Sequence, residues 1–262
     1  MTPRCYATMC IQSDSPAQHG RSWGRTEPPM FRLFAALLLN HTRLPLYVIH
    51  DAPVNPVALL GKAVPPRQLH GAHAQVRPFQ VDIIKSRVRS PISQRHYESM
   101  YTKLHIWRLP CRQVAYVDYD VLTLRSPDPI FDACGNAAFC AVQARGQGQR
   151  YFNGGVFVAR PDYATFEKFE HTMRADEARN TVHEYAEQDL LNALYWDWWE
   201  LPSRYNVQGV GSGRSWDPQS DVWVHEKYWL LPDALRAWLH LPKSLPAPSW
   251  FDYIRNFWAH LW

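Results

Sequence analysis

The sequence has no apolar run long enough to cross a membrane. Stretches near the N-terminus such as Phe34 to Leu39 are far shorter than the about 18 residues that a transmembrane helix needs. Residues Met1 to Gln18 also lack the charged start, apolar segment and small-residue cleavage site of a secretory signal. We therefore expect no transmembrane segment, no secretory signal and a cytoplasmic location.

Cysteine is scarce, odd in number and without any CxxC pair. This pattern argues against a disulfide framework and against a zinc ribbon. We interpret all five cysteines as buried or idle thiols in a reducing compartment: Cys5, Cys10, Cys111, Cys134 and Cys140.

An excess of one charge sign is also missing, since the formal net charge is only +4. Such a mild basic excess is compatible with a phosphate-bearing ligand but is too small for the charged surface of a nucleic-acid-binding protein. No internal repeat or low-complexity segment stands out. We expect no nucleic-acid partner.

The composition that is present is typical of one globular domain. Of the 262 residues, 46% are hydrophobic and 20% are charged, which excludes a disordered chain. Aromatic residues reach 14%; large rings usually fill a core, although they also suit sugar rings. A C-terminal aromatic run has helical spacing and could pack on the domain, on a partner or on a membrane surface: Trp250, Phe251, Tyr253, Ile254, Phe257, Trp258, Leu261 and Trp262.

Predicted strands and helices alternate along the first half of the chain, and the second half is mixed. We predict strands at 4–12, 44–50, 79–84, 113–117, 121–124, 137–143, 151–159 and 222–225. We predict helices at 30–40, 56–62, 94–109, 161–174 and 184–196. This order indicates an α/β fold with an open twisted sheet that binds ligands at the carboxyl edge of its strands.

Two acidic residues, Asp118 and Asp120, follow a buried strand at this edge, with Tyr119 between them. Carboxylates at positions i and i+2 of a turn can hold one divalent cation together. Hard oxygen ligands suit Mg²⁺ or Mn²⁺, which usually bind one or two carboxylates and the phosphates of a substrate. The pair alone is a weak signal, because acidic surface turns are frequent.

Five ordered motifs give the pair its context, and together they resemble the glycogenin and galactinol synthase group, glycosyltransferase family eight. They begin with Tyr101-Thr-Lys-Leu-His-Ile-Trp107 and continue with VAYVDYDVLTL, which leads to Pro129-Ile-Phe131. The remaining three are Phe152-Asn-Gly-Gly-Val156, Glu187-Gln-Asp-Leu-Leu-Asn192 and Leu201-Pro-Ser-Arg-Tyr-Asn206. The resemblance covers about residues 4–229, and its specific motifs lie between Tyr101 and Asn206.

The resemblance implies a single domain of the GT-A fold, a Rossmann-like twisted mixed sheet flanked by helices. Its nucleotide-sugar half would cover about residues 1–125, its acceptor half about 126–230 and an aromatic helical tail about 231–262. The implied reaction is the Mn²⁺-dependent transfer of a hexose from a UDP-sugar, with retention at the anomeric carbon. Mg²⁺ is an alternative ion, and UDP-glucose and UDP-galactose are the expected donors.

Site residues are transferred from the family motif by motif. Asp118, Asp120 and His225 resemble the metal ligands, and Tyr119 belongs to the same donor segment. Lys103 resembles the lysine that reaches the phosphate and sugar of the donor, where a fixed cation offsets charge on the departing UDP. The other residues that resemble donor-binding positions are Thr8 beside the uracil, Asn153, Gly154, Glu184, Glu187 and Gln188 at the sugar, and Lys227 at the diphosphate. Lys103, Glu187 and Gln188 are the catalytic candidates.

Three segments differ from the family pattern. Glu184 and Glu187 stand where the family prefers Asp, and each is one methylene longer. The family's TxN-acid segment reads Thr8-Met-Cys-Ile-Gln12 here. Its C-terminal HFxGxxKPW segment reads His225-Glu-Lys-Tyr-Trp229, which shortens the loop around Lys227.

Two other functions remain open at this stage. A nucleotide-sugar- or carbohydrate-binding protein of the same fold that has lost turnover would explain the altered segments. A nucleotidyltransferase would also explain paired acids, but its Gly-rich, basic N-terminal loop is missing from Ser13 to Pro29. The sequence does not identify the acceptor, and a tyrosine of the protein itself is one candidate. It also leaves open whether the protein forms a homodimer.

Overall fold

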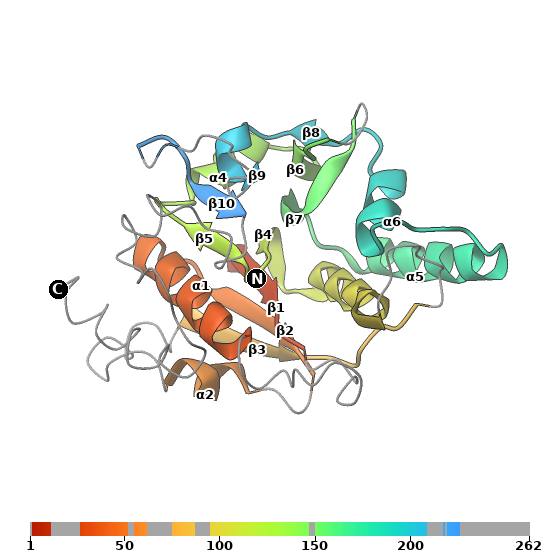
Figure 1. The fold of residues 1–262 in the computed structure, drawn as a ribbon, viewed down its shortest axis with the longest axis horizontal. Coiled ribbons are helices and arrows are strands. Elements are labelled where there is room, and N and C mark those ends of the chain that lie inside the picture. The colour runs from red at the N-terminus through yellow and green to blue at the C-terminus, as the bar shows by residue number, and fades with distance from the viewer. Residues whose placement is uncertain are drawn as a thin grey trace.

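A twisted central sheet with helices on both faces organises the protein in the computed structural model (Figure 1). The structure describes residues 2–11, 27–51, 55–61, 75–86, 95–146, 150–208, 217 and 219–225. Lys227 and the predicted C-terminal aromatic tail lie outside these residues. Among the described residues, no helix is both long and apolar enough to cross a bilayer.

The central sheet has seven strands in the order β3-β2-β1-β4-β7-β6-β8 within the described chain. Strands β1, β2, β3 and β4 are parallel, whereas β7 runs antiparallel to both of its neighbours. Their bounds are β1 Thr2–Met9, β2 Leu46–His50, β3 Val76–Gln80, β4 Cys111–Val117, β6 Phe139–Gln143, β7 Phe152–Ala159 and β8 Trp199–Glu200. A smaller sheet joins β5 (Val121–Thr123), β10 (Trp223–His225) and β9 (Val207–Gln208).

Helices cover both faces of the central sheet because its strands are apolar on both sides. One core lies under η1 (Arg95–Arg108), α5 (Tyr163–Ala178) and α6 (Glu187–Leu194), and the other under α1 (Glu27–His41) and α4 (Pro129–Cys134). Short elements α2 (Pro56–Gly61) and η2 (Ser203–Tyr205) complete the described chain.

Aromatic rings fill much of the first core. The ring of Phe139 lies 4.3 Å from that of Tyr195 and 5.0 Å from that of Phe157, and Trp107 lies 4.5 Å from Phe169. Such close ring pairs add to the stability that area burial alone provides. Much of the high aromatic content therefore serves packing, as is usual for large rings.

The main differences from the predicted elements have local causes. Helix α4 occupies a segment that the sequence marks only as a turn, because Pro129 sits in its first turn, where proline is tolerated. Helix α6 begins at Glu187 and not at Glu184, because Ala186 has φ +51°, outside the helical region. The strand predicted at 79–84 lies at Val76–Gln80.

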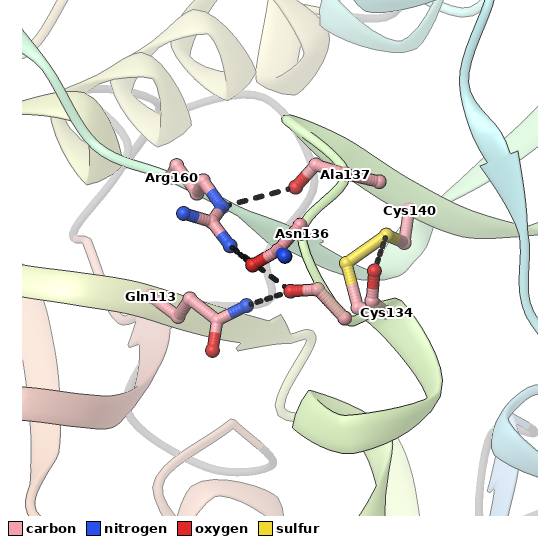
Figure 2. The surroundings of a disulfide bond; sticks show 7 residues. Gln113, Cys134, Asn136, Ala137, Cys140 and Arg160 are labelled. Carbon is pink, nitrogen blue, oxygen red and sulfur yellow. Dashed lines mark hydrogen bonds between the residues drawn. A yellow bond between two sulfur atoms is a disulfide. The ribbon is translucent and has the colours of Figure 1, made fainter.

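The interpretation of the cysteines as thiols is wrong for four of the five. Cys5 joins Cys111 across β1 and β4, with Cα atoms 6.2 Å apart. Cys134 joins Cys140 between α4 and β6, with Cα atoms 5.7 Å apart (Figure 2). Cys10 is buried and belongs to neither disulfide.

Sequence spacing could not reveal these pairs, because the fold brings together residues 106 positions apart in one case and a short turn joins them in the other. The cytoplasmic location stays a prediction, and it loses the support of the cysteines, since disulfides persist mainly in oxidising compartments.

Hydrogen bonds from Gln113 on β4 and from Arg160, the residue after β7, reinforce the turn inside the Cys134–Cys140 disulfide (Figure 2). Gln113 Nε2 of β4 donates to the Gly135 carbonyl at 3.0 Å. Arg160 Nε, just beyond β7, donates to the Ala137 carbonyl at 3.2 Å. The disulfide and these hydrogen bonds together hold α4 near the starts of β4 and β6, away from the carboxyl end of β4.

We expect the Cys5→Ala/Cys111→Ala variant to lose about 2–4 kcal/mol of unfolding free energy, because the long cross-link no longer constrains the unfolded chain. Urea unfolding with and without dithiothreitol measures the loss, and the reductant should shift the wild type more than the variant. Cys10→Ala is the control, since it removes a buried sulfur and no cross-link. Peptide mapping without reductant that finds no Cys5–Cys111 linkage would contradict the expectation.

Candidate active site

The candidate site forms where β4 ends and β7 begins. Asp118, directly after β4, donates its backbone N–H to the Gly155 carbonyl of β7 at 2.8 Å. A turn closed by Val121 N–H to the Asp118 carbonyl at 3.1 Å carries the acid pair. Since β10 pairs antiparallel with β5, His225 lies opposite Val121, the residue after Asp120. Strand pairing therefore brings the backbones of all three predicted metal ligands to one edge.

Lys103 is the central side chain of this site. It comes from η1 and is only 2% exposed. Its Nζ lies 2.6 Å from Glu187 Oε1, 3.4 Å from Asp118 Oδ1 and 3.1 Å from the Gly154 carbonyl oxygen. These three oxygens match the three hydrogens of an ammonium group. The predicted residues Lys103, Asp118, Gly154 and Glu187 thus form one connected cluster.

Opposite charges keep Lys103 and Glu187 ionised in this cluster despite their burial. Burial by itself lowers the pKa of Lys103, but the Asp118 and Glu187 carboxylates outweigh it, so the pKa is raised and the ammonium stays protonated. Burial raises the pKa of Glu187, and the Lys103 ammonium opposes this shift. The buried lysine and glutamate therefore depend on each other for their charged forms.

Tyr116 supports the cluster from β4. Its hydroxyl donates to Asp118 Oδ1 at 2.6 Å, and its ring lies 4.7 Å from Lys103 Nζ. Burial and the Asp118 carboxylate raise the pKa of Tyr116, so the hydroxyl remains a donor. Lys103 and Tyr116 both contact Oδ1 of Asp118, and the Asp118 side chain is 29% exposed. Asp118 can therefore offer Oδ2 to a ligand.

Gln188 borders the cluster from the first turn of α6. Its Oε1 accepts the Gly154 N–H at 2.7 Å, and its Nε2 donates to the Tyr151 hydroxyl at 3.1 Å. That hydroxyl in turn donates to Asp189 Oδ1. A Cβ atom at Gly154 would lie 3.4 Å from the Gln188 side chain, so the strand and the helix are packed closely here.

Asn153, the residue before Gly154, is partly exposed at the same edge. Its Oδ1 accepts the Gly155 N–H and the Asn206 Nδ2–H, each at 2.9 Å. Asn206, which donates the second of these hydrogen bonds, is fully buried.

The remaining predicted residues differ in their placement. Thr8 is fully buried near the end of β1, and no described residue hydrogen-bonds its hydroxyl. Tyr119 packs partly against the core under α1. Glu184 is exposed on the connection that precedes α6, and Lys227 lies outside the described residues.

Sequence reasoning missed Tyr116, Tyr151 and Asn206 as members of the site. Tyr116 and Asn206 lie inside motifs that the sequence analysis quoted, so their motif position was the only signal. Their contacts depend on which strands become neighbours.

A complete metal site is not formed by the side chains that the structure describes, since no group of three His, Cys, Asp or Glu side chains among them converges. Asp118 and Asp120 would need a third ligand, and of His225 only the backbone is described. The metal assignment stays a prediction.

Comparison with known proteins decides the family. The sequence pattern of "Glycosyl transferase family 8" matches residues 67–226, more than half of the chain and the whole edge described above. The chain belongs to glycosyl transferase family 8. A curated glycogenin of Neurospora crassa is 32% identical over 111 residues, which cover 42% of this chain and 15% of that protein.

Solved structures confirm the predicted GT-A fold of this family 8 member. The galactosyltransferase LgtC, crystallised with donor and acceptor sugar analogues, has a TM-score of 0.62 at 16% identity, covering 97% of this chain and 95% of its own. The glycosyltransferase GlyE of Streptococcus pneumoniae has a TM-score of 0.60 at 15% identity, covering 98% and 62%. Mouse xyloside xylosyltransferase 1 reaches 0.51 at 13% identity, covering 87% and 98%.

Lys103→Met should destabilise the protein by about 3–5 kcal/mol at pH 7, because the buried Glu187 carboxylate loses its partner. The deficit should shrink as the pH falls from about 7 to 5. A carboxyl group whose pKa is higher in the folded than in the unfolded protein favours folding as the pH decreases. Urea unfolding across this pH range measures the effect.

The matched control is the Lys103→Met/Glu187→Leu double variant, which removes both charges and should recover much of the stability. A deficit that is independent of pH, or a double variant less stable than Lys103→Met, would show that the two side chains do not form a mutually dependent buried pair.

Proposed function

We propose that the protein is a metal-dependent, retaining glycosyltransferase that transfers a hexose from a UDP-sugar to a hydroxyl acceptor. The observation that carries the proposal is the Lys103 cluster, in which side chains from separate family motifs meet at the edge where Asp118 leaves β4. Family membership supports sugar transfer, and the donor, the ion and the acceptor are the parts proposed here.

The protein's own residues would orient the donor. Lys103 holds Asp118 and Glu187 in place, and its ammonium offsets part of their negative charge, which would otherwise repel a diphosphate. Gln188 and the Gly154 peptide form a close-packed wall of the same site. Such fixed dipoles and charges lower the barrier because they need no reorganisation during the reaction.

A divalent cation fits the donor atoms available at this edge. Asp118 and Asp120 supply hard carboxylate oxygens, and His225 lies in the strand that pairs beside them. These residues would hold Mn²⁺ or Mg²⁺. When bound, the ion would act as a Lewis acid on the diphosphate of the donor and stabilise the departing UDP.

A donor-binding protein without turnover is the second candidate, and one observation favours it. The carboxylate of Glu187, one methylene longer than the aspartate preferred at this motif position, is held by Lys103 at 2.6 Å. A carboxylate engaged in this way is not available to a sugar unless the pair rearranges. Binding of UDP-glucose in calorimetry without release of UDP would support this candidate.

Asp120→Ala should lower UDP release from UDP-glucose or UDP-galactose at least about 100-fold, because a metal contributes several kcal/mol to stabilising the leaving group. EDTA should reduce the wild type to a similar level, and Mn²⁺ should restore it. Asp132→Ala is the control: this exposed acid pairs with Arg4 at 2.5 Å on α4, and surface pairs contribute little. Full activity of Asp120→Ala in the presence of EDTA would refute metal-dependent transfer.

Intact mass after incubation with UDP-glucose and Mn²⁺ tests whether the protein is its own acceptor. Self-glycosylation would appear as added hexose units. An unchanged mass together with UDP release only when a sugar or polyol is present would identify an external acceptor.

A further inference from the structure

Asn206 is a buried polar residue that the proposed reaction has not yet used. It follows η2, is fully buried, and its Nδ2 donates to Asn153 Oδ1 at 2.9 Å. No described residue donates to its own Oδ1. A buried amide oxygen without a partner is costly, and a leucine of similar size would avoid that cost. The contact with Asn153 therefore accounts for an asparagine at position 206.

The orientation of the Asn153 amide follows from its two partners. The Gly155 N–H, 2.9 Å away, can only donate, so the atom facing it must be the oxygen of Asn153. Asn206 supplies a second donor to the same oxygen. Two lone pairs of one carbonyl oxygen are thereby occupied. A rotation of the Asn153 amide by half a turn would lose the hydrogen bond from Gly155 and, while Asn206 Nδ2 faces Asn153, the one from Asn206 as well.

The Nδ2 group of Asn153 is what remains for a ligand. Asn153 is partly exposed, whereas Asn206 lies behind it in the core. The next residue, Gly154, contacts both Lys103 and Gln188 through its peptide atoms. Asn153 and Gly154 are neighbours at the start of β7, so the Asn153 amide lies at the same end of the sheet as the Lys103 cluster.

We propose that Asn206 is a positioning residue that fixes the Asn153 amide with its hydrogens toward the ligand, so that this position selects an oxygen able to accept hydrogen bonds. A sugar hydroxyl or a phosphate oxygen has this chemistry. The inference rests on the proposed function in one respect only, namely that the ligand is a nucleotide sugar.

Amide hydrogen exchange at Gly155 tests the orientation without any need for turnover. Asn206→Asp places an acceptor opposite Asn153 Oδ1, which should turn the Asn153 amide and release the Gly155 N–H. We expect exchange at Gly155 to become at least about tenfold faster, the effect of losing one hydrogen bond of about 1.4 kcal/mol. Asn206→Leu removes one donor without adding an acceptor and should give a smaller increase, about threefold.

Gln113→Glu is the matched control, because it also changes a buried amide to a carboxylate, at the far end of β4. It should lower stability comparably and leave exchange at Gly155 unchanged. Kinetic measurement is the second readout: Asn206→Asp should raise the donor KM about tenfold with a smaller effect on kcat, and Gln113→Glu should leave the donor KM within about twofold of the wild type.

Three outcomes separate the two proposals. Faster exchange at Gly155 and a higher donor KM in the Asn206 variants, but not in Gln113→Glu, support the positioning role. Unchanged exchange and KM in both Asn206 variants overturn it. A wild type that turns over no UDP-sugar refutes the proposed function, while exchange at Gly155 still decides how Asn153 is oriented; if Asn206→Asp fails to fold, Asn206→Leu decides alone.

Discussion

One buried ammonium group holds the candidate site together. Lys103 belongs to η1 and contacts oxygens from the turn after β4, from β7 and from α6. A buried charge is costly unless it is paired and hydrogen-bonded. Displacing any one of the three partner segments would therefore leave the Lys103 ammonium partly unpaired in the core. The same contacts thus define the geometry of the site and contribute to the stability of the fold.

The antiparallel strand β7 determines what the site contains. In a purely parallel sheet, only carboxyl ends of strands would meet at this edge. Because β7 runs against β4, its first residues lie beside the end of β4, and the Gly155 carbonyl accepts the Asp118 N–H at 2.8 Å. An acidic turn therefore faces a glycine-containing strand start, where small residues let the peptide of Gly154 approach Lys103 and Gln188.

The sequence predicted the alternation of strands and helices well, because buried strands are continuous apolar runs. It also predicted that Lys103 and Glu187 belong to one site, through motif order, but not that they form an ion pair, which depends on side-chain reach. Local backbone conformation was harder to predict from the sequence. Pro129 suggested a turn where helix α4 begins, and the positive φ of Ala186 places the start of α6 later than predicted. The disulfides and the contact between Asn206 and Asn153 escaped prediction because they follow from which segments become neighbours.

The disulfide between β1 and β4 has a consequence for biosynthesis. β1 is made before β4 and lies inside the sheet, and Cys5 meets its partner only after 106 further residues have been added. The Cys5 thiol must therefore stay unmodified during synthesis until β4, which carries Cys111, has been made. Premature pairing with one of the other cysteines would place the wrong segments together, so enzymes that rearrange such bonds would help this chain reach its native sheet order.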